Sequence, residues 1–281
     1  MARDPVRDYL TAQRDALTGT EPAARDGDVE AVHDMRVAVR RLRSTLRTFR
    51  GIWGREAVDP IRAELSWFGG RLGRVRDTQV MAARLDEAIH AEPPEVVFGP
   101  VAARVRQRFA AEGAEALARL GKALDSGRYR RVRARLDRLI EDGSRPKGKW
   151  VDRRIGKDLR RADDMLDAAV ARPADDPDRD RALHDARKAY KRARYAVEVR
   201  APKGRPLVKR LKALQDLLGA HQDATVTRGV LREHAVRAYV DRENTFTYGL
   251  LYGRQLAAAD ESERAVPAAA KEARRRKVRR W

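Results

Sequence analysis

Apolar residues recur at spacings of three and four along almost the whole 281-residue chain, and this periodicity restricts its fold more than any other feature. Such spacing places apolar side chains on one face of an α-helix, whereas half-buried strands alternate between apolar and polar residues. Ala, Arg, Leu, Glu and Asp dominate the sequence, and signals for strands are nearly absent. The sequence therefore predicts an all-α fold.

The clearest helix is predicted between residues 29 and 50, in the stretch EAVHDMRVAVRRLRSTLRTFR. Asp28 is expected to cap its start, and Gly51 is expected to end it. Residues 23–27 are expected to be the connection into this helix, and the next helix is expected to start at Pro60. One side of this helix is apolar, with Met35, Ala38, Val39, Leu42, Leu46 and Phe49. Another side carries His33, Arg36, Arg40, Arg43, Arg47 and Arg50, and no acidic residue interrupts it.

Five arginines in one row repel each other, and this repulsion is unusual for a face that only needs to be soluble. Exposed helix faces usually mix charges, because Glu–Arg pairs four residues apart stabilise a helix and like pairs destabilise it. The row therefore predicts a bound anion.

The composition agrees with an anionic partner. Lys and Arg total 62 residues against 42 for Asp and Glu, so the formal net charge is +20. Arg, which outnumbers Lys, suits bidentate contacts with phosphate. Nucleic acid, inorganic polyphosphate and an anionic membrane surface are the candidate partners on charge alone.

Other function classes are disfavoured by what the sequence lacks. There are no cysteines, which excludes disulfides, thiolate zinc sites and cysteine nucleophiles. No apolar run approaches the roughly 20 residues of a membrane span, and the first residues lack the apolar core of a signal peptide. We therefore expect a soluble cytoplasmic protein with no membrane partner, no metal site and no cofactor.

The second half of the chain repeats the first. The pattern His-Asp-x-Arg-x-Ala starts at His33 and again at His184, 151 residues later. The pattern Leu-Gly-x-x-x-Asp starts at Leu72 and again at Leu218, 146 residues later. Two motifs in the same order at nearly the same offset indicate an internal duplication. The basic row recurs as well, interrupted only by Glu198 in the position that Arg47 occupies in the first half.

This repeat predicts two pseudo-symmetric antiparallel helical bundles. The halves are expected at residues 1–140 and 150–266, joined by a linker at 141–149 that is rich in Gly, Ser and Pro. Residues 267–281 are expected to form a basic tail, either helical or disordered. If the halves pack about a two-fold axis, the two basic rows line one shared groove or channel.

At these motifs the sequence resembles the CHAD family, the conserved histidine α-helical domain. The resemblance lies in VHDMRVAVRRLRSTLRTFR, RLGRVRDTQV, LHDARKAYKRARYAVE and LQDLLGAHQDATV. It covers nearly the whole chain, so residues 1–281 are expected to form a single CHAD-like domain.

The resemblance implies binding of inorganic polyphosphate and, as in some members, association of the protein with polyphosphate granules. Some members also carry a triphosphatase domain of the CYTH type, but this chain lacks the E-x-E-x-K signature of that domain. The resemblance therefore implies binding without hydrolysis.

The predicted binding residues follow the repeated rows. They are His33, Arg36, Arg40, Arg43 and Arg47 in the first half, and His184, Arg187, Lys191 and Arg194 in the second. Two further clusters are predicted to extend the groove, namely Arg71, Arg74 and Arg76, and Arg153, Lys157 and Arg160. Asp77 and Asp223 are expected to orient arginines of the rows by charge-assisted hydrogen bonds.

Three functions remain open from the sequence. Polyphosphate carries a charge on each unit and no bases, which suits a chain with only 6% aromatic residues. Binders of single-stranded nucleic acid usually interleave aromatics with basic residues, so nucleic acid is expected only as a weaker competitor. A phosphoanhydride hydrolase would need a metal or a base at the bound chain, and no catalytic residue is identified. The oligomeric state is left open.

Overall fold

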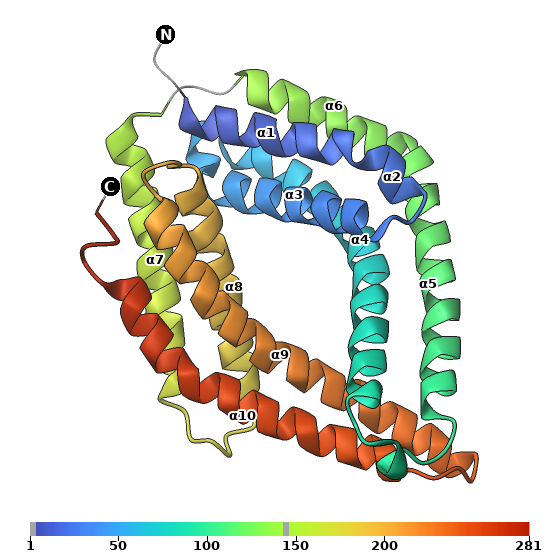
Figure 1. Ribbon diagram of the computed structural model, residues 1–281. Coiled ribbons are helices and arrows are strands. Elements are labelled where there is room, and N and C mark those ends of the chain that lie inside the picture. Colours follow the sequence, from blue (N-terminus) through green and yellow to red (C-terminus); the bar gives the residue numbers. More distant parts are fainter. Residues whose placement is uncertain (1–3, 143–145, 281) are drawn as a thin grey trace. The chain divides into compact units, whose positions relative to one another are not determined.

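A computed structural model describes residues 4–142 and 146–280, and every regular element in these ranges is a helix. The prediction of an all-α fold is therefore confirmed (Figure 1). The α-helices are α1 (Pro5–Gly19), α2 (Glu21–Arg25), α3 (Val29–Thr48), α4 (Arg55–His90), α5 (Val101–Asp125), α6 (Gly127–Asp142), α7 (Gly148–Val170), α8 (Arg179–Glu198), α9 (Arg205–Val240) and α10 (Phe246–Arg274). Short 3₁₀ turns occur at Arg50–Ile52 and Pro94–Val96.

Helix α3 forms as its sequence predicts. The carboxylate of Asp28 accepts a hydrogen bond from the backbone N–H of Ala31 at 2.7 Å, which satisfies one of the free donors of the first turn. The six residues of the predicted apolar side are all buried. Burial of such side chains stabilises the fold by about 1.5–3 kcal/mol each for the larger ones.

Three local predictions are wrong. Gly51 does not end α3, because the helix stops at Thr48 and the glycine with a left-handed φ of +87° is Gly54. Pro60 does not start α4, because the helix begins five residues earlier at Arg55. Pro60 removes one hydrogen bond from the Glu56 carbonyl, and both residues are exposed, so water can replace that bond.

The third wrong prediction concerns residues 23–27, which were expected to be only a connection. They include the end of helix α2, which starts at Glu21 with Pro22 in its first turn. Proline is tolerated there because the first backbone N–H groups of a helix have no helical partner.

The chain forms two compact units that are not continuous in sequence. The first comprises residues 1–82 and 107–156, and the second comprises residues 83–106 and 157–281. Residues 83–106 therefore belong with the second unit, whereas the predicted halves assign them to the first. The internal duplication and the shared groove stay predictions.

The first unit is built on α3. Helix α1 packs against α3 and α6, and α2 packs against α1 and α3 (Figure 1). The contact face of α1 consists of Val6, Leu10 and Leu17, which are at most 1% exposed. This packing buries the apolar side of α3.

The second unit is built on α9, which packs along both α8 and α10 (Figure 1). Ion pairs tie residues 83–106 to these helices. Arg84 contacts Asp223 at 2.8 Å, and Arg254 contacts Glu92 at 2.9 Å. Phe98 meets the ring of Phe246 edge-on at a centroid distance of 5.5 Å. The segment is thus held by packing as well as by charge.

The predicted linker contains helix at both of its ends, and the predicted tail is helical as far as Arg274. Helix α6 includes residues 141 and 142, and α7 begins at Gly148, while residues 143–145 of the predicted linker lie outside the described residues. Helix α10 continues through Pro267 to Arg274, and Val266, Ala270 and Ala273 on it are buried.

A carboxylate on α7 holds the segment after α10. Asp163 accepts hydrogen bonds from Tyr190 at 2.7 Å and from Arg279 at 2.6 Å. Burial alone would raise the pKa of Asp163, but these donors lower it. The described part of the predicted tail is therefore ordered by ion pairs.

Candidate polyanion-binding site

The basic face of α3 lies against α4 in the first unit. His33, Arg36, Arg40 and Arg43 are partly exposed, and Arg47 is exposed. None of them belongs to the buried core. We call these side chains, together with Arg62, Arg76 and Asp77 of α4, the α3–α4 face.

Arg36 is held by two residues of the Leu-Gly-x-x-x-Asp motif. Its Nη1 donates to Oδ1 of Asp77 at 2.8 Å, and a Cβ built on Gly73 would lie 3.8 Å from its Nη2. Gly73 therefore leaves room for the guanidinium to lie flat against α4. Because Asp77 is 67% exposed, it orients the arginine at the surface and forms no buried ion pair.

Arg43 lies beside a second cation and has no acidic partner among the residues that the structure describes. Burial lowers the pKa of Arg43, and the charge of Arg62 on α4 lowers it further. Arg43 forms no ion pair with any residue of the described ranges, whereas Arg62 contacts Asp59 at 2.8 Å. Two guanidinium groups at one partly dehydrated place favour a bound anion.

His33 has the same kind of surroundings. Burial lowers its pKa, and the positive charges of Arg76 and Arg40 add to the effect. Its ring is therefore held in the neutral form. Arg76, from the first of the two predicted extension clusters, therefore lies near His33, and we count it with the α3–α4 face.

The other two arginines of that cluster lie elsewhere. Arg71 and Arg74 line a small pocket with Glu112, Glu115 and Arg119 of α5, so acidic residues accompany them. They lie on the side of α4 that faces α5. Their predicted role in binding is thus not favoured by their surroundings.

In the second unit, α8 and α9 repeat the central contact. Arg187 lies against Gly219, where an added Cβ would be 3.5 Å from its Nη2. Arg187 forms no ion pair with any residue that the structure describes. His184 is hydrogen-bonded to Gln222, and burial lowers its pKa, followed by the charges of Lys188 and Arg187. We call these residues, with Lys191 and Arg194, the α8–α9 face.

One cation of the α8–α9 face is compensated within its own helix. Arg194 is ion-paired to Glu198 and donates to Gln215 at 2.9 Å. Asp223, expected to orient an arginine of the row, instead contacts Arg84. The interruption of the second basic row by Glu198 therefore neutralises one of its arginines.

His221, which occupies the place of Val75 in the repeat, is buried and structural. Its Nε2 lies 3.3 Å from Asp180 and 3.4 Å from Glu263. The remaining predicted residues, Arg153, Lys157 and Arg160, are exposed on α7 and form no ion pair with a described residue.

The sequence reasoning missed Arg62 and Gln222. Arg62, Gly69, Gly73 and Arg76 follow one another at spacings of seven, four and three, so one helical wheel of α4 would have placed Arg62 beside the row of α3. Gln222 directly precedes Asp223, in the place that Arg76 occupies in the first motif.

Within residues 4–142 and 146–280, no group of three or more His, Cys, Asp or Glu side chains could hold a metal ion. No helix in those ranges is long and apolar enough to cross a membrane.

A match to a protein-family model identifies the family to which the fold and its motifs belong. Residues 8–232, which include all the repeated motifs, match the family model of the CHAD domain. The chain belongs to the CHAD family. This family is associated with polyphosphate binding.

Curated relatives and solved structures agree with the CHAD assignment. This chain is 34% identical over 275 residues to each of two uncharacterized proteins of Mycobacterium tuberculosis. They are MT2285 of strain CDC 1551 / Oshkosh and Rv2226 of strain H37Rv. The match covers 93% of this CHAD chain, which spans about half (51%) of the length of each relative.

Among solved structures, the CHAD domain from the plant Ricinus communis superposes with a TM-score of 0.69 at 25% identity. That match covers 95% of this chain and 90% of the plant domain. PptA from Streptomyces chartreusis superposes with a TM-score of 0.80 at 20% identity, over 95% of this chain and 98% of PptA. The latter likeness concerns the fold alone.

Proposed function

We propose that this CHAD protein binds inorganic polyphosphate through the α3–α4 face and the α8–α9 face. The observation that carries the proposal is the pair Arg43 and Arg62, two partly buried cations of which Arg43 has no acidic partner among the described residues. A phosphate between them would remove their repulsion and accept hydrogen bonds from both guanidinium groups.

Polyphosphate suits these faces better than nucleic acid. The predicted binding residues carry guanidinium, ammonium and imidazole groups, and none of them is Phe, Tyr or Trp. Single-stranded nucleic acid gains much of its affinity from stacking of bases on aromatic side chains. We therefore propose nucleic acid as a weaker competitor only, and binding of polyphosphate without hydrolysis.

The test is direct binding of long-chain polyphosphate to the full chain, measured by isothermal titration calorimetry at two salt concentrations. The double variant Arg36→Ala/Arg40→Ala should lose about 3–6 kcal/mol of binding free energy, since charge-assisted hydrogen bonds contribute about 1.5–3 kcal/mol each. Arg43→Ala should also weaken binding.

The control is Arg232→Ala/Arg237→Ala, which removes the same charge from exposed positions of α9 outside both faces. It should change affinity only slightly. Equal losses in the two double variants would mean that net charge alone attracts the ligand. Displacement of polyphosphate by RNA at equal phosphate concentration would contradict the preference, and release of phosphate with Mg²⁺ would contradict binding without hydrolysis.

Anchoring to polyphosphate granules is part of the same proposal. A fluorescently labelled chain should collect on granules in cells that make polyphosphate, and it should stay dispersed in cells that do not. The Arg36→Ala/Arg40→Ala variant should stay dispersed in both.

A further inference from the structure

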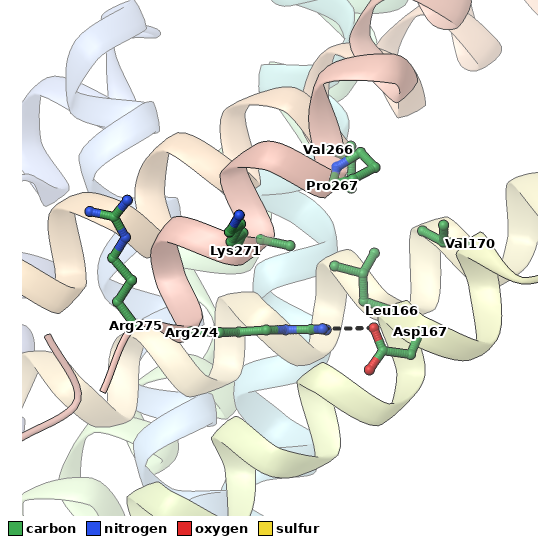
Figure 2. Close-up of a pocket in the computed structure, with 9 residues that line it drawn as sticks. Leu166, Asp167, Val170, Val266, Pro267, Lys271, Arg274 and Arg275 are labelled. Atoms are coloured by element: carbon green, nitrogen blue, oxygen red, sulfur yellow. Dashed lines mark hydrogen bonds and ion pairs between the residues drawn. The ribbon is translucent and has the colours of Figure 1, made fainter. Parts of the chain in front are cut away.

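A groove in the second unit lies between the end of α7 and the last turns of α10 (Figure 2). Its volume is about 490 Å³, which is within the range of small-molecule sites. The apolar part of its lining consists of Leu166 and Val170 from α7 and Val266, Pro267 and Ala270 from α10. Of this lining, Val170 (37% exposed) and Pro267 meet water in the absence of a ligand, whereas Leu166, Val266 and Ala270 are buried beneath them.

Positive side chains border the apolar part. Lys271, Arg274 and Arg275 line the groove, together with one acidic residue, Asp167. Arg274 contacts Asp167 at 2.8 Å, so the only acidic charge of the lining is balanced (Figure 2). Arg275 contacts Glu272 at 2.6 Å. Lys271 forms no ion pair with a residue of the described ranges.

The chain beyond the groove adds to the positive potential. Arg276, Lys277 and Arg280 follow within ten residues of Lys271 and are exposed. The link from Arg279 to Asp163, at 2.6 Å, keeps this segment on the second unit. An anionic group near Lys271 would therefore be attracted both locally and at longer range.

We propose that the groove binds an amphiphile with a single apolar chain and a phosphate head group. The chain would cover the apolar lining, and the phosphate would bind Lys271. Inorganic polyphosphate does not suit the groove, because it has no apolar atoms to bury against valine and leucine. A cationic amphiphile would be repelled by Lys271. This site is separate from the α3–α4 and α8–α9 faces and does not depend on the proposed polyphosphate binding.

The test is calorimetric titration of the full chain with decyl phosphate below its micelle concentration, with and without excess long-chain polyphosphate. Binding at the groove should give the same affinity in both titrations, because polyphosphate does not suit the groove. We expect one site, with inorganic phosphate and decyltrimethylammonium each binding at least about tenfold more weakly, which corresponds to about 1.4 kcal/mol. Equal binding of all three, or no binding of decyl phosphate, would overturn the proposal.

Two variants locate the site. Val170→Glu places a negative charge on the apolar lining, and Lys271→Glu reverses the unpaired cation; each should weaken decyl phosphate at least about tenfold. Matched controls are Val226→Glu, at a valine of α9 that is 46% exposed, and Lys122→Glu, at an exposed lysine of α5. The controls should bind normally. Losses as large in the controls would place binding outside the groove, and circular dichroism verifies that each variant keeps its helices.

Discussion

His33 and His184 are each placed where a proton on the ring would meet positive charge. Burial lowers the pKa of both, and arginine or lysine side chains lower it further. The folded protein therefore holds these rings neutral, while the unfolded chain takes up protons as the pH falls through about 6.5. The stability that neutral rings provide is present above that pH and is lost below it. An anion bound beside the rings reverses the local repulsion, so binding and protonation favour each other.

Polyphosphate affinity should consequently rise as the pH is lowered from about 8 to about 6, by up to about tenfold for each histidine whose pKa rises by one unit. The internal phosphates of a long chain stay ionised over this pH range, so the change in affinity would come from titration of groups on the protein. Titration calorimetry in two buffers of different ionisation enthalpy would measure the proton uptake directly.

The double variant His33→Gln/His184→Gln keeps a hydrogen-bond donor at both places but cannot titrate. It should bind with an affinity that is nearly independent of pH. His90→Gln is the control, because His90 is exposed and outside both faces. An unchanged pH dependence in the double variant would contradict the role of the two histidines.

At the scale of the elements, close approach between helices sets which residues are allowed. Gly204 precedes α9 and is buried against the end of α8. A Cβ at this position would lie 2.7 Å from the carbonyl oxygen of Val197 and 2.9 Å from its Cγ1. A backbone atom cannot move aside as the tip of a side chain can, so any larger residue would push α9 away from α8.

Gly204→Ala should therefore lower the free energy of unfolding by about 1–3 kcal/mol, the usual cost of overpacking. Gly229→Ala is the matched variant within the same helix, where an added Cβ meets no atom within 4 Å. It should raise the free energy by about 0.5–1 kcal/mol, because alanine has the higher helix propensity. Urea denaturation of both variants measures the difference, and changes of the same sign would contradict the packing argument.

The elements were largely predictable from the sequence because helices depend on near neighbours. The apolar period of α3 and the cap at Asp28 act within one turn or two, and both are found as predicted. The wrong predictions at Gly51 and Pro60 relied on the tendency of glycine to end a helix and of proline to start one. At both positions the surrounding structure outweighs that tendency. A Cβ at Gly51 would lie 3.1 Å from the ring of Trp150, so this glycine makes room for a contact from a distant residue.

Which arginine each carboxylate of the site contacts was less predictable, because this too depends on residues that are distant in the sequence. Asp77 and Asp223 occupy equivalent places in the repeat, yet Asp77 contacts Arg36 and Asp223 contacts Arg84. A carboxylate pairs with the cation that the fold brings nearest, and spacing along one helix does not contain that information. The row of cations was visible in the sequence, whereas finding Arg62 beside Arg43 required a helical wheel of α4 as well.

At the scale of the whole molecule, the chain passes between the two compact units three times, after residues 82, 106 and 156. Neither unit is therefore a single stretch of sequence. A cut at the predicted linker would separate residues 83–106 from the helices that they contact. Cooperative folding of either unit therefore requires the intact chain. The internal repeat alone would suggest two halves that fold separately.

A fragment of residues 148–281 should consequently be unstable. It would lack the partners of Arg254 and Phe246, among others, and would expose apolar surface. We expect incomplete helicity by circular dichroism, with partial recovery when a peptide of residues 83–106 is added. A fragment that folds fully without the peptide would show that these contacts contribute little.

The glycines beside Arg36 and Arg187 affect how homologous sequences should be compared. Alanine would fit at either place, because its Cβ would stand 3.8 Å from the nearest guanidinium atom at Gly73 and 3.5 Å at Gly219. A leucine or phenylalanine would force the guanidinium to turn away. A homologue could thus retain every arginine and still present those charges in unproductive directions, so counting cations is a poor guide to which relatives share the ligand.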